Sequence, residues 1–147
     1  MADASVADGL IRQLVAIHGE EGICPTQDDW RAIFAVGEGG SVDLVNLLGF
    51  AAEVASADGT ISGADAYSRY TSGISGAFDR VGGELVFFGR VRHMFAFDAG
   101  DVWDAVIVTR YPSAKALAEM WLDPEFIAAH ANRVDGVMRS QALVIGR

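Results

Sequence analysis

The sequence predicts an α+β fold, and three observations support this prediction. Strand-like and helix-like segments follow one another as strand, helix, strand, strand, helix, strand, at 42–50, 67–78, 84–97, 103–111, a long helical stretch and 143–145. A glycine-rich segment at 37–40 separates this series from two helical segments before it. The length of 147 residues suits about one domain. The order β-α-β-β-α-β is ferredoxin-like and predicts a four-stranded antiparallel sheet.

Residues 1–40 are expected to form a helical N-terminal extension, and residues 41–147 the ferredoxin-like domain. A first helix over 5–17 is predicted by apolar residues at helical spacing: Val6, Leu10, Leu14 and Ile17. Thr26 is a suitable N-cap for a second helix. The GEGG segment at 37–40 follows a helix, opens a strand and lacks a GK[ST] sequence, which favours a turn over a phosphate-binding loop.

The first predicted strand is apolar on both faces, which is typical of a strand covered on both sides. Asn46 is the exception on the face that it shares with Leu44, Leu48 and Phe50. Residues 51–65 are expected to form a loop because they carry Asp-Gly and Ser-Gly turn signals.

Two helical regions are expected to cover the sheet. The first carries one apolar stripe, and its Gly73 and Gly76 predict close packing on the sheet; the stripe is Tyr67, Tyr70, Ile74 and Phe78. The second follows Pro112 and is expected to bend at Asp123-Pro124. Its last segment is expected to share an apolar face made of Ile127, His130, Ala131, Val134 and Met138.

A sheet with both helices on one face leaves its other face uncovered, so a homodimer is expected.

The formal net charge of −9 and a single lysine argue against nucleic-acid or anionic membrane partners. No run of about 20 apolar residues is present, and the N-terminus lacks the features of a secretory signal, so a cytoplasmic protein is expected. Cys24 is the only cysteine, which leaves no multi-cysteine metal site.

Several segments resemble a known family. VDLVNLLGF, GADAYSRY, GGELVFFGRV, WDAVIVTRYPSAKALAEMW and DPEF are similar to an uncharacterised family of the dimeric α+β-barrel superfamily, domain of unknown function thirteen-thirty. The resemblance covers about residues 41–147. It implies a ferredoxin-like protomer whose open sheet face packs on a second copy. The superfamily includes cofactor-independent monooxygenases, isomerases, heme-handling enzymes and ligand binders, so the fold does not choose among them.

Two residues are candidates for catalysis. Asn46 could orient a substrate carbonyl, or its amide could bond neighbouring backbone or a buried water. His130 could act as a general base, or it could be a satisfied, partly buried histidine.

Other residues are candidates for ligand binding. Arg110 could clamp a ligand carboxylate or form an ordinary ion pair. An aromatic wall, or simply core packing, is predicted for Tyr67, Tyr70, Trp103 and Trp121.

The set Asn46, Trp103 and His130 resembles the Asn, Trp and His residues of small heme-degrading monooxygenases. Trp103 falls at the start of its strand, which departs from that pattern. No cofactor is therefore expected. No metal is expected either, because no other histidine or carboxylate stands at ligand spacing to His93.

Two functions follow as hypotheses. In the first, the homodimer has a small apolar pocket that binds or converts a small organic molecule, with His130 as general base in an isomerase-like or cofactor-independent monooxygenase-like reaction. In the second, the chain is a non-catalytic structural or interaction protein without a small-molecule site.

Overall fold

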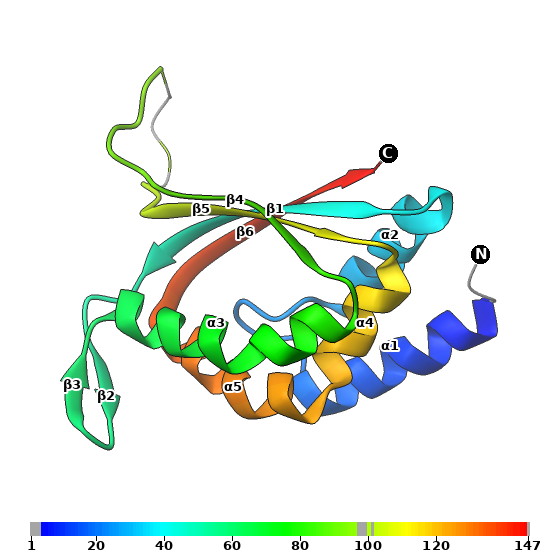
Figure 1. Cartoon of the computed structure of the whole chain (residues 1–147), viewed down its shortest axis with the longest axis horizontal. Coiled ribbons are helices and arrows are strands. Elements are labelled where there is room, and N and C mark those ends of the chain that lie inside the picture. Colours follow the sequence, from blue (N-terminus) through cyan, green and yellow to red (C-terminus); the bar gives the residue numbers. More distant parts are fainter. Residues whose placement is uncertain (1–3, 97–99, 101, 147) are drawn as a thin grey trace.

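The structure, a computed structural model, describes residues 4–96, 100 and 102–146 (Figure 1). The elements run in the order α1 (Ala4–His18), α2 (Gln27–Val36), the 3-10 turn η1 (Gly37–Gly39), β1 (Val42–Phe50), β2 (Val54–Ser56), β3 (Gly59–Ile61), α3 (Gly63–Arg80), β4 (Glu84–Arg90), β5 (Ala105–Tyr111), α4 (Ala114–Leu122), α5 (Pro124–Gly136) and β6 (Val137–Gly146). The α+β class is confirmed.

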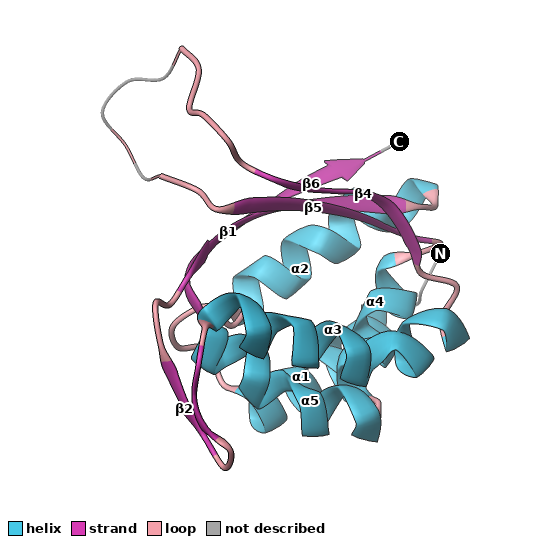
Figure 2. Cartoon of the chain, turned by 60° about the vertical axis from the view of Figure 1, so that its left-hand side comes forward, coloured by secondary structure: helices cyan, strands magenta, loops and turns pink. Residues whose placement is uncertain are grey.

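Four strands form one antiparallel sheet in the order β4-β5-β1-β6. The strand lengths differ from the predicted ones. β4 ends at Arg90, so residues 91–96, which were predicted to belong to it, form no strand; residue 97, the predicted end, lies outside the described residues. β5 starts at Ala105, and the described residues 91–96 project beyond the sheet (Figures 1 and 2). β6 is longer than the predicted 143–145 because its whole length pairs with β1.

The prediction of a loop over 51–65 was wrong in part. Val54–Ser56 and Gly59–Ile61 pair as a separate two-stranded hairpin, with Asp58 and Gly59 at its turn. Gly59 has φ of 104°, a left-handed conformation that glycine adopts without a steric penalty. Strands of three residues are too short to show an alternating pattern, so the sequence revealed only the turn.

All the described helices lie on one side of the four-stranded sheet (Figures 1 and 2). α3 packs along α5, while α1 packs on α4 and α2 contacts both α4 and β6. The N-terminal extension therefore completes the helical layer of its own chain.

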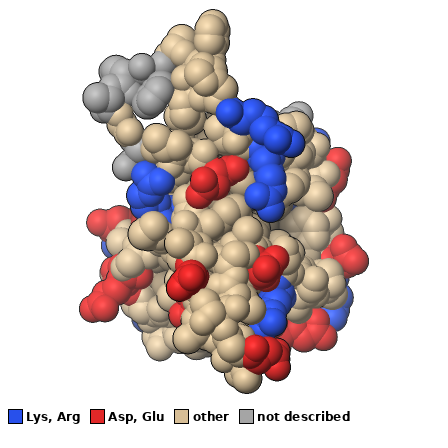
Figure 3. Space-filling view, turned by 90° about the vertical axis from the view of Figure 1, so that its left-hand side faces the viewer, with Lys and Arg blue, Asp and Glu red and all other residues tan. Residues whose placement is uncertain are grey.

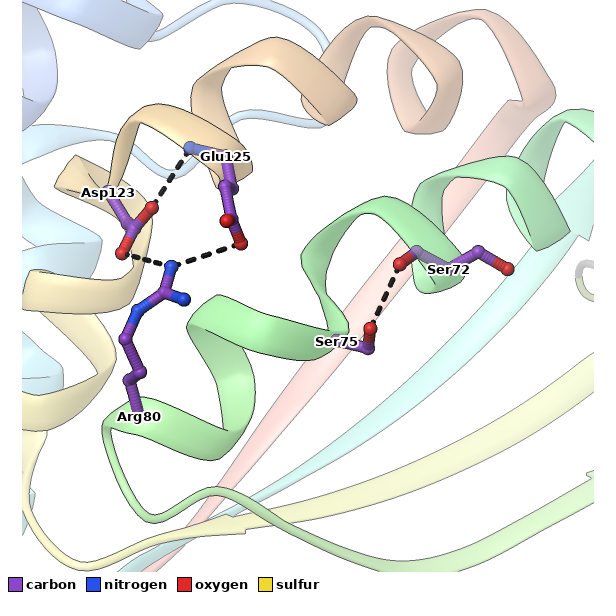
Figure 4. Close-up of polar contacts among 5 residues, drawn as sticks. All are labelled: Ser72, Ser75, Arg80, Asp123 and Glu125. Atoms are coloured by element: carbon purple, nitrogen blue, oxygen red, sulfur yellow. Dashed lines mark hydrogen bonds and ion pairs between the residues drawn. The ribbon is translucent and has the colours of Figure 1, made fainter.

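Polar caps determine where these helices begin. Thr26 forms the predicted cap of α2: its hydroxyl accepts from the Asp29 backbone N–H, and the Asp29 carboxylate accepts from the Thr26 backbone N–H. Asp123 separates α4 from α5, which confirms the bend, and it caps α5. Figure 4 shows Arg80, at the end of α3, donating to Asp123 at 2.8 Å and to Glu125 at 3.0 Å. This cluster joins α3 to the junction of the other two helices.

Gly73 permits a close approach, but the partner is a helix and not the sheet as predicted. A Cβ at Gly73 would lie 2.7 Å from the Ala129 Cβ of α5. A Cβ at Gly76 would meet only the flexible side-chain ends of Glu125 and Arg80. Gly73 is therefore the glycine that sets the distance between α3 and α5.

The predicted apolar face of the last helix was wrong except for His130, which is buried. Ile127 and Val134 are 38% and 45% exposed, and Met138 belongs to β6. The buried face of α5 is instead formed by Phe126, Ala129, His130, Arg133 and Gly136. Because Arg133 belongs to this face, a pattern of apolar residues alone did not reveal it.

The sheet face that points away from the helices is rich in apolar side chains, and no described helix covers it (Figure 1). The strand register places Val45 beside Val108 and Leu47 beside Val106 on this face. Phe87, Leu143 and Ile145 extend the patch and are 54%, 43% and 47% exposed. We call this surface the outer face, and the surface under the helices the inner face.

Candidate functional site

A cavity of about 410 Å³ lies between the inner face of the sheet and α3. This volume is within the range of about 300 to 1,000 Å³ that is usual for small-molecule sites. Its wall is formed by Leu44, Asn46, Tyr67, Ser68, Tyr70, Thr71, Ile74, Ser75, Phe78, Leu85, Phe88, Ile107, Thr109, Tyr111, Leu117, Trp121 and Arg133. We call it the α3 cavity.

The mouth of the α3 cavity lies between α3 and the edge strand β4. On the β4 side, Leu85 and Phe88 are 56% and 49% exposed although both line the cavity. On the helix side, Ser68 and Ser75 are exposed lining residues. A ligand could therefore enter from solvent without separating the helices from the sheet.

Three tyrosines give the interior of the α3 cavity its polar character. Burial raises the pKa of Tyr111 to about 12 and also raises the pKa values of Tyr67 and Tyr70. Their hydroxyl groups are therefore protonated at neutral pH and can donate hydrogen bonds. Asn46 lies on the opposite wall, where its Nδ2 makes only a long 3.5 Å contact to the Ile107 carbonyl oxygen.

Arg133 is the residue that the sequence analysis missed. Its side chain comes from the buried face of α5, is 8% exposed and lines the α3 cavity. Among the described residues, Nη1 has no hydrogen-bond partner although it is buried, and Nη2 makes one 3.5 Å contact to the Ser140 hydroxyl. Its Cζ lies 5.9 Å from the centre of the Trp121 ring. Its helical spacing could have revealed Arg133, because it lies seven residues after Phe126 and four after Ala129, on the same helix face.

A second cavity of about 410 Å³ lies on the other side of Arg133. Both cavities are lined by Leu44, Asn46, Leu117, Trp121 and Arg133. The second cavity also includes Asp29 and Cys24. Burial raises the pKa of the Cys24 thiol, which disfavours the thiolate.

The structure brings four of the predicted residues to one place. Asn46, Tyr67, Tyr70 and Trp121 all line the α3 cavity, although they come from one strand and two helices. Asn46 faces the cavity because side chains alternate along the strand, and Tyr67 and Tyr70 face it because they belong to the apolar stripe of α3.

His130 lies outside the α3 cavity lining, in an aromatic cluster behind it. Its ring stacks on Phe126 at 5.3 Å and lies 4.9 Å from the rings of Trp121 and His18. Burial, together with the charges of Arg133 and His18, lowers the pKa of His130 to about 4. The ring is therefore neutral at pH 7 and a weak base.

Arg110 and Trp103 also lie away from the α3 cavity. Arg110 is on the outer face, where its Nε and Nη2 donate to Asp43 at 2.8 and 3.1 Å. Trp103 precedes β5, and its ring lies under the Arg139 guanidinium at 5.5 Å. Of the set that resembles heme-degrading enzymes, only Asn46 lines the cavity.

Within the described residues, no group of three or more His, Cys, Asp and Glu side chains could hold a metal ion. In the same part of the chain, no helix is both long and apolar enough to cross a membrane. On the face in Figure 3, basic and acidic side chains are interspersed.

The chain is similar to solved structures of unknown function. Two crystal structures of the RPA0582 protein, described in one case as from Rhodopseudomonas palustris and in the other as methylated, are 28% identical to it. They match with TM-scores of 0.75 and 0.76, over 84% and 86% of this chain and 94% of theirs. A dimeric protein of unknown function with a ferredoxin-like fold from Bacteroides fragilis matches at 11% identity and a TM-score of 0.48, over 76% of this chain and 99% of its own. No protein-family model and no curated protein matches the chain.

Proposed function

We propose that this protein binds a small, mainly apolar organic molecule in the α3 cavity. The observation that carries the proposal is a cavity of ligand size, open to solvent, whose walls are formed mainly by aromatic and aliphatic side chains. Asn46, Tyr67 and Tyr70 would make polar contacts with the ligand, and Trp121 would contact it through its ring face. His130 would support Trp121 from behind rather than touch the ligand.

Binding is favoured over conversion because the α3 cavity lacks a suitable base. Its titratable lining residues are three tyrosines and Arg133; Asp, Glu, His, Cys and Lys are absent from its described lining. The raised pKa values of the tyrosines keep them protonated. Isomerisation or reaction with O2 by proton abstraction would need a base that a ligand itself brings.

The proposal includes a ferredoxin-like protomer that forms a homodimer through its outer face. The strand order β4-β5-β1-β6, with the intervening helices on one side, supports this fold. The outer face has an apolar centre between two charged borders, Arg110 with Asp43 at one end and Arg139 at the other. An apolar core with a polar rim is the usual anatomy of a protein interface. A second copy would cover this centre.

Ligand binding is tested by a thermal-shift and calorimetry screen of small aromatic and alicyclic compounds. A compound at a hundred times its dissociation constant adds about 2.7 kcal/mol to the free energy of unfolding. Ser75→Trp places a large side chain at the cavity mouth and is expected to weaken every hit. Ser72→Trp, one turn earlier and outside the lining, is the matched control (Figure 4).

The competing function is a structural or interaction protein without a small-molecule site. Hits that Ser75→Trp and Ser72→Trp weaken equally, or a screen without hits, would favour that function over ours.

A further inference from the structure

Arg133 is a buried cation without a described counter-ion. Among the described residues it forms no ion pair, although its side chain is 8% exposed. A charged group removed from water loses much of its hydration free energy, and a paired anion normally offsets this loss. Arg110 illustrates the usual arrangement, since it is more exposed and yet is paired with Asp43.

The α3 cavity beside Arg133 is complementary to an anion. The chain has 20 acidic residues, but the described lining includes none of them. The charge of Arg133 reaches the hydroxyl groups of Tyr67, Tyr70 and Tyr111, which are donors at neutral pH. One guanidinium and several hydroxyl donors are thus available to an acceptor in the cavity.

We propose that the α3 cavity binds an aromatic or alicyclic monocarboxylate, with the carboxylate paired to Arg133 and the ring between the tyrosines and Trp121. This inference rests on the proposed function and names the class of ligand. Guanidinium and carboxylate match in geometry and form strong, charge-assisted hydrogen bonds. The long 3.5 Å contact to Ser140 is weak, so the guanidinium can turn toward the cavity at little cost.

A singly charged ligand fits the cavity better than a phosphate ester. The described lining offers one guanidinium and no lysine, whereas a dianion would need further cations. The second cavity is the weaker choice for an anion, because the Asp29 carboxylate is part of its wall. The apolar surface from Ile74, Phe78, Phe88 and Ile107 suits the body of the ligand and not a second charge.

The experiment compares matched pairs of compounds by calorimetry at neutral pH. Naphthalene-2-carboxylate, indole-3-acetate and cyclohexanecarboxylate are each measured against their primary amides, which have nearly the same shape without the charge. We expect at least one acid to bind about tenfold or more tightly than its amide, which corresponds to about 1.4 kcal/mol. Arg133→Met should remove this preference, and Arg133→Lys should retain part of it.

Arg69→Met is the control for loss of a positive charge. Arg69 lies on α3, is exposed and makes only a 3.7 Å ion pair with Asp58. Arg69→Met should leave the preference for acids over amides unchanged. The comparison of acid with amide on the wild-type protein needs no variant, so it holds even if a variant folds poorly.

Three outcomes would overturn the inference. Equal affinity for acids and amides would exclude a carboxylate site while leaving a small-molecule site in place. An acid preference that survives Arg133→Met would assign the anion to another group. Absence of binding by every acid and amide, at concentrations up to the solubility limit, would overturn the inference together with the proposed function.

Discussion

The arginines on the two sides of the sheet differ in whether a carboxylate pairs with them. On the outer face, Arg110 is held by two hydrogen bonds from its guanidinium to Asp43 of the neighbouring strand. On the inner side, Arg133 is more deeply buried and no described carboxylate pairs with it. Arg110 therefore has its partner within the chain, whereas the partner proposed for Arg133 is a bound ligand. The sequence alone pointed to Arg110 and not to Arg133, because the pairing of Arg110 with Asp43 depends on strand register.

The largest expected effect is on assembly. Val108→Lys places a charge at the centre of the outer face and should convert the proposed dimer into a monomer, because burying an unpaired ammonium is strongly unfavourable. Light scattering at micromolar concentration measures the mass. Val134→Lys, at an exposed position on α5, should leave the mass unchanged. A wild-type monomer would contradict the role given to the outer face.

Ile107 directly precedes Val108 on β5, but it lines the α3 cavity. Ile107→Phe should therefore weaken ligand binding while the mass stays that of the dimer. If both variants change both properties, the two faces do not act independently.

The second effect concerns the helical layer behind the cavity and its dependence on pH. His130 has its pKa lowered to about 4 in the folded chain, against about 6.5 when unfolded, so the unfolded state binds more protons between these values. The folded state should lose about 3 kcal/mol of stability through His130 as the pH falls through this window. Urea unfolding of wild type and His130→Leu at several pH values checks this. His93→Ala, in the exposed connection after β4, is the control variant for replacement of a histidine.

The third effect concerns the spacing of α3 and α5. Gly73→Ala should lower the free energy of unfolding by about 2 kcal/mol, because the new Cβ would lie 2.7 Å from the Ala129 Cβ. Gly9→Ala, in open space on α1, should raise it by about 0.5 to 1 kcal/mol through helix propensity. Chemical denaturation measures both. Stabilisation by Gly73→Ala would mean that the two helices can separate freely.

The smallest effect tests the two arginines directly. Arg133→Met should raise the free energy of unfolding of the ligand-free protein by about 1 kcal/mol, because it removes a buried cation without a described counter-ion. Arg110→Met should lower it slightly, since it leaves Asp43 without this partner. The same denaturation series compares them. A loss of stability in both variants would show that Arg133 is satisfied within the chain.

The helices and the four strands of the main sheet followed from local patterns, and the site did so only in part. The alternation in β1 placed Asn46 on the inner face, and the α3 stripe placed Tyr67 and Tyr70 on the side of the helix that faces it, where the structure has them. The partner of Gly73 and the surroundings of His130 depend on how α5 crosses α3, which no local pattern encodes. Arg133 was missed because charged residues are rarely expected on a buried helix face.

The shared wall between the two cavities makes the single cysteine useful as an optical reporter. Cys24 is partly exposed, lines the second cavity, and its thiol feels the charge of Arg133. An environment-sensitive dye attached to this thiol would be the only label in the molecule. A carboxylate that pairs with Arg133 from the α3 cavity would change the electric field at the dye. The chain thus offers a one-step route to a fluorescent sensor for its own ligand.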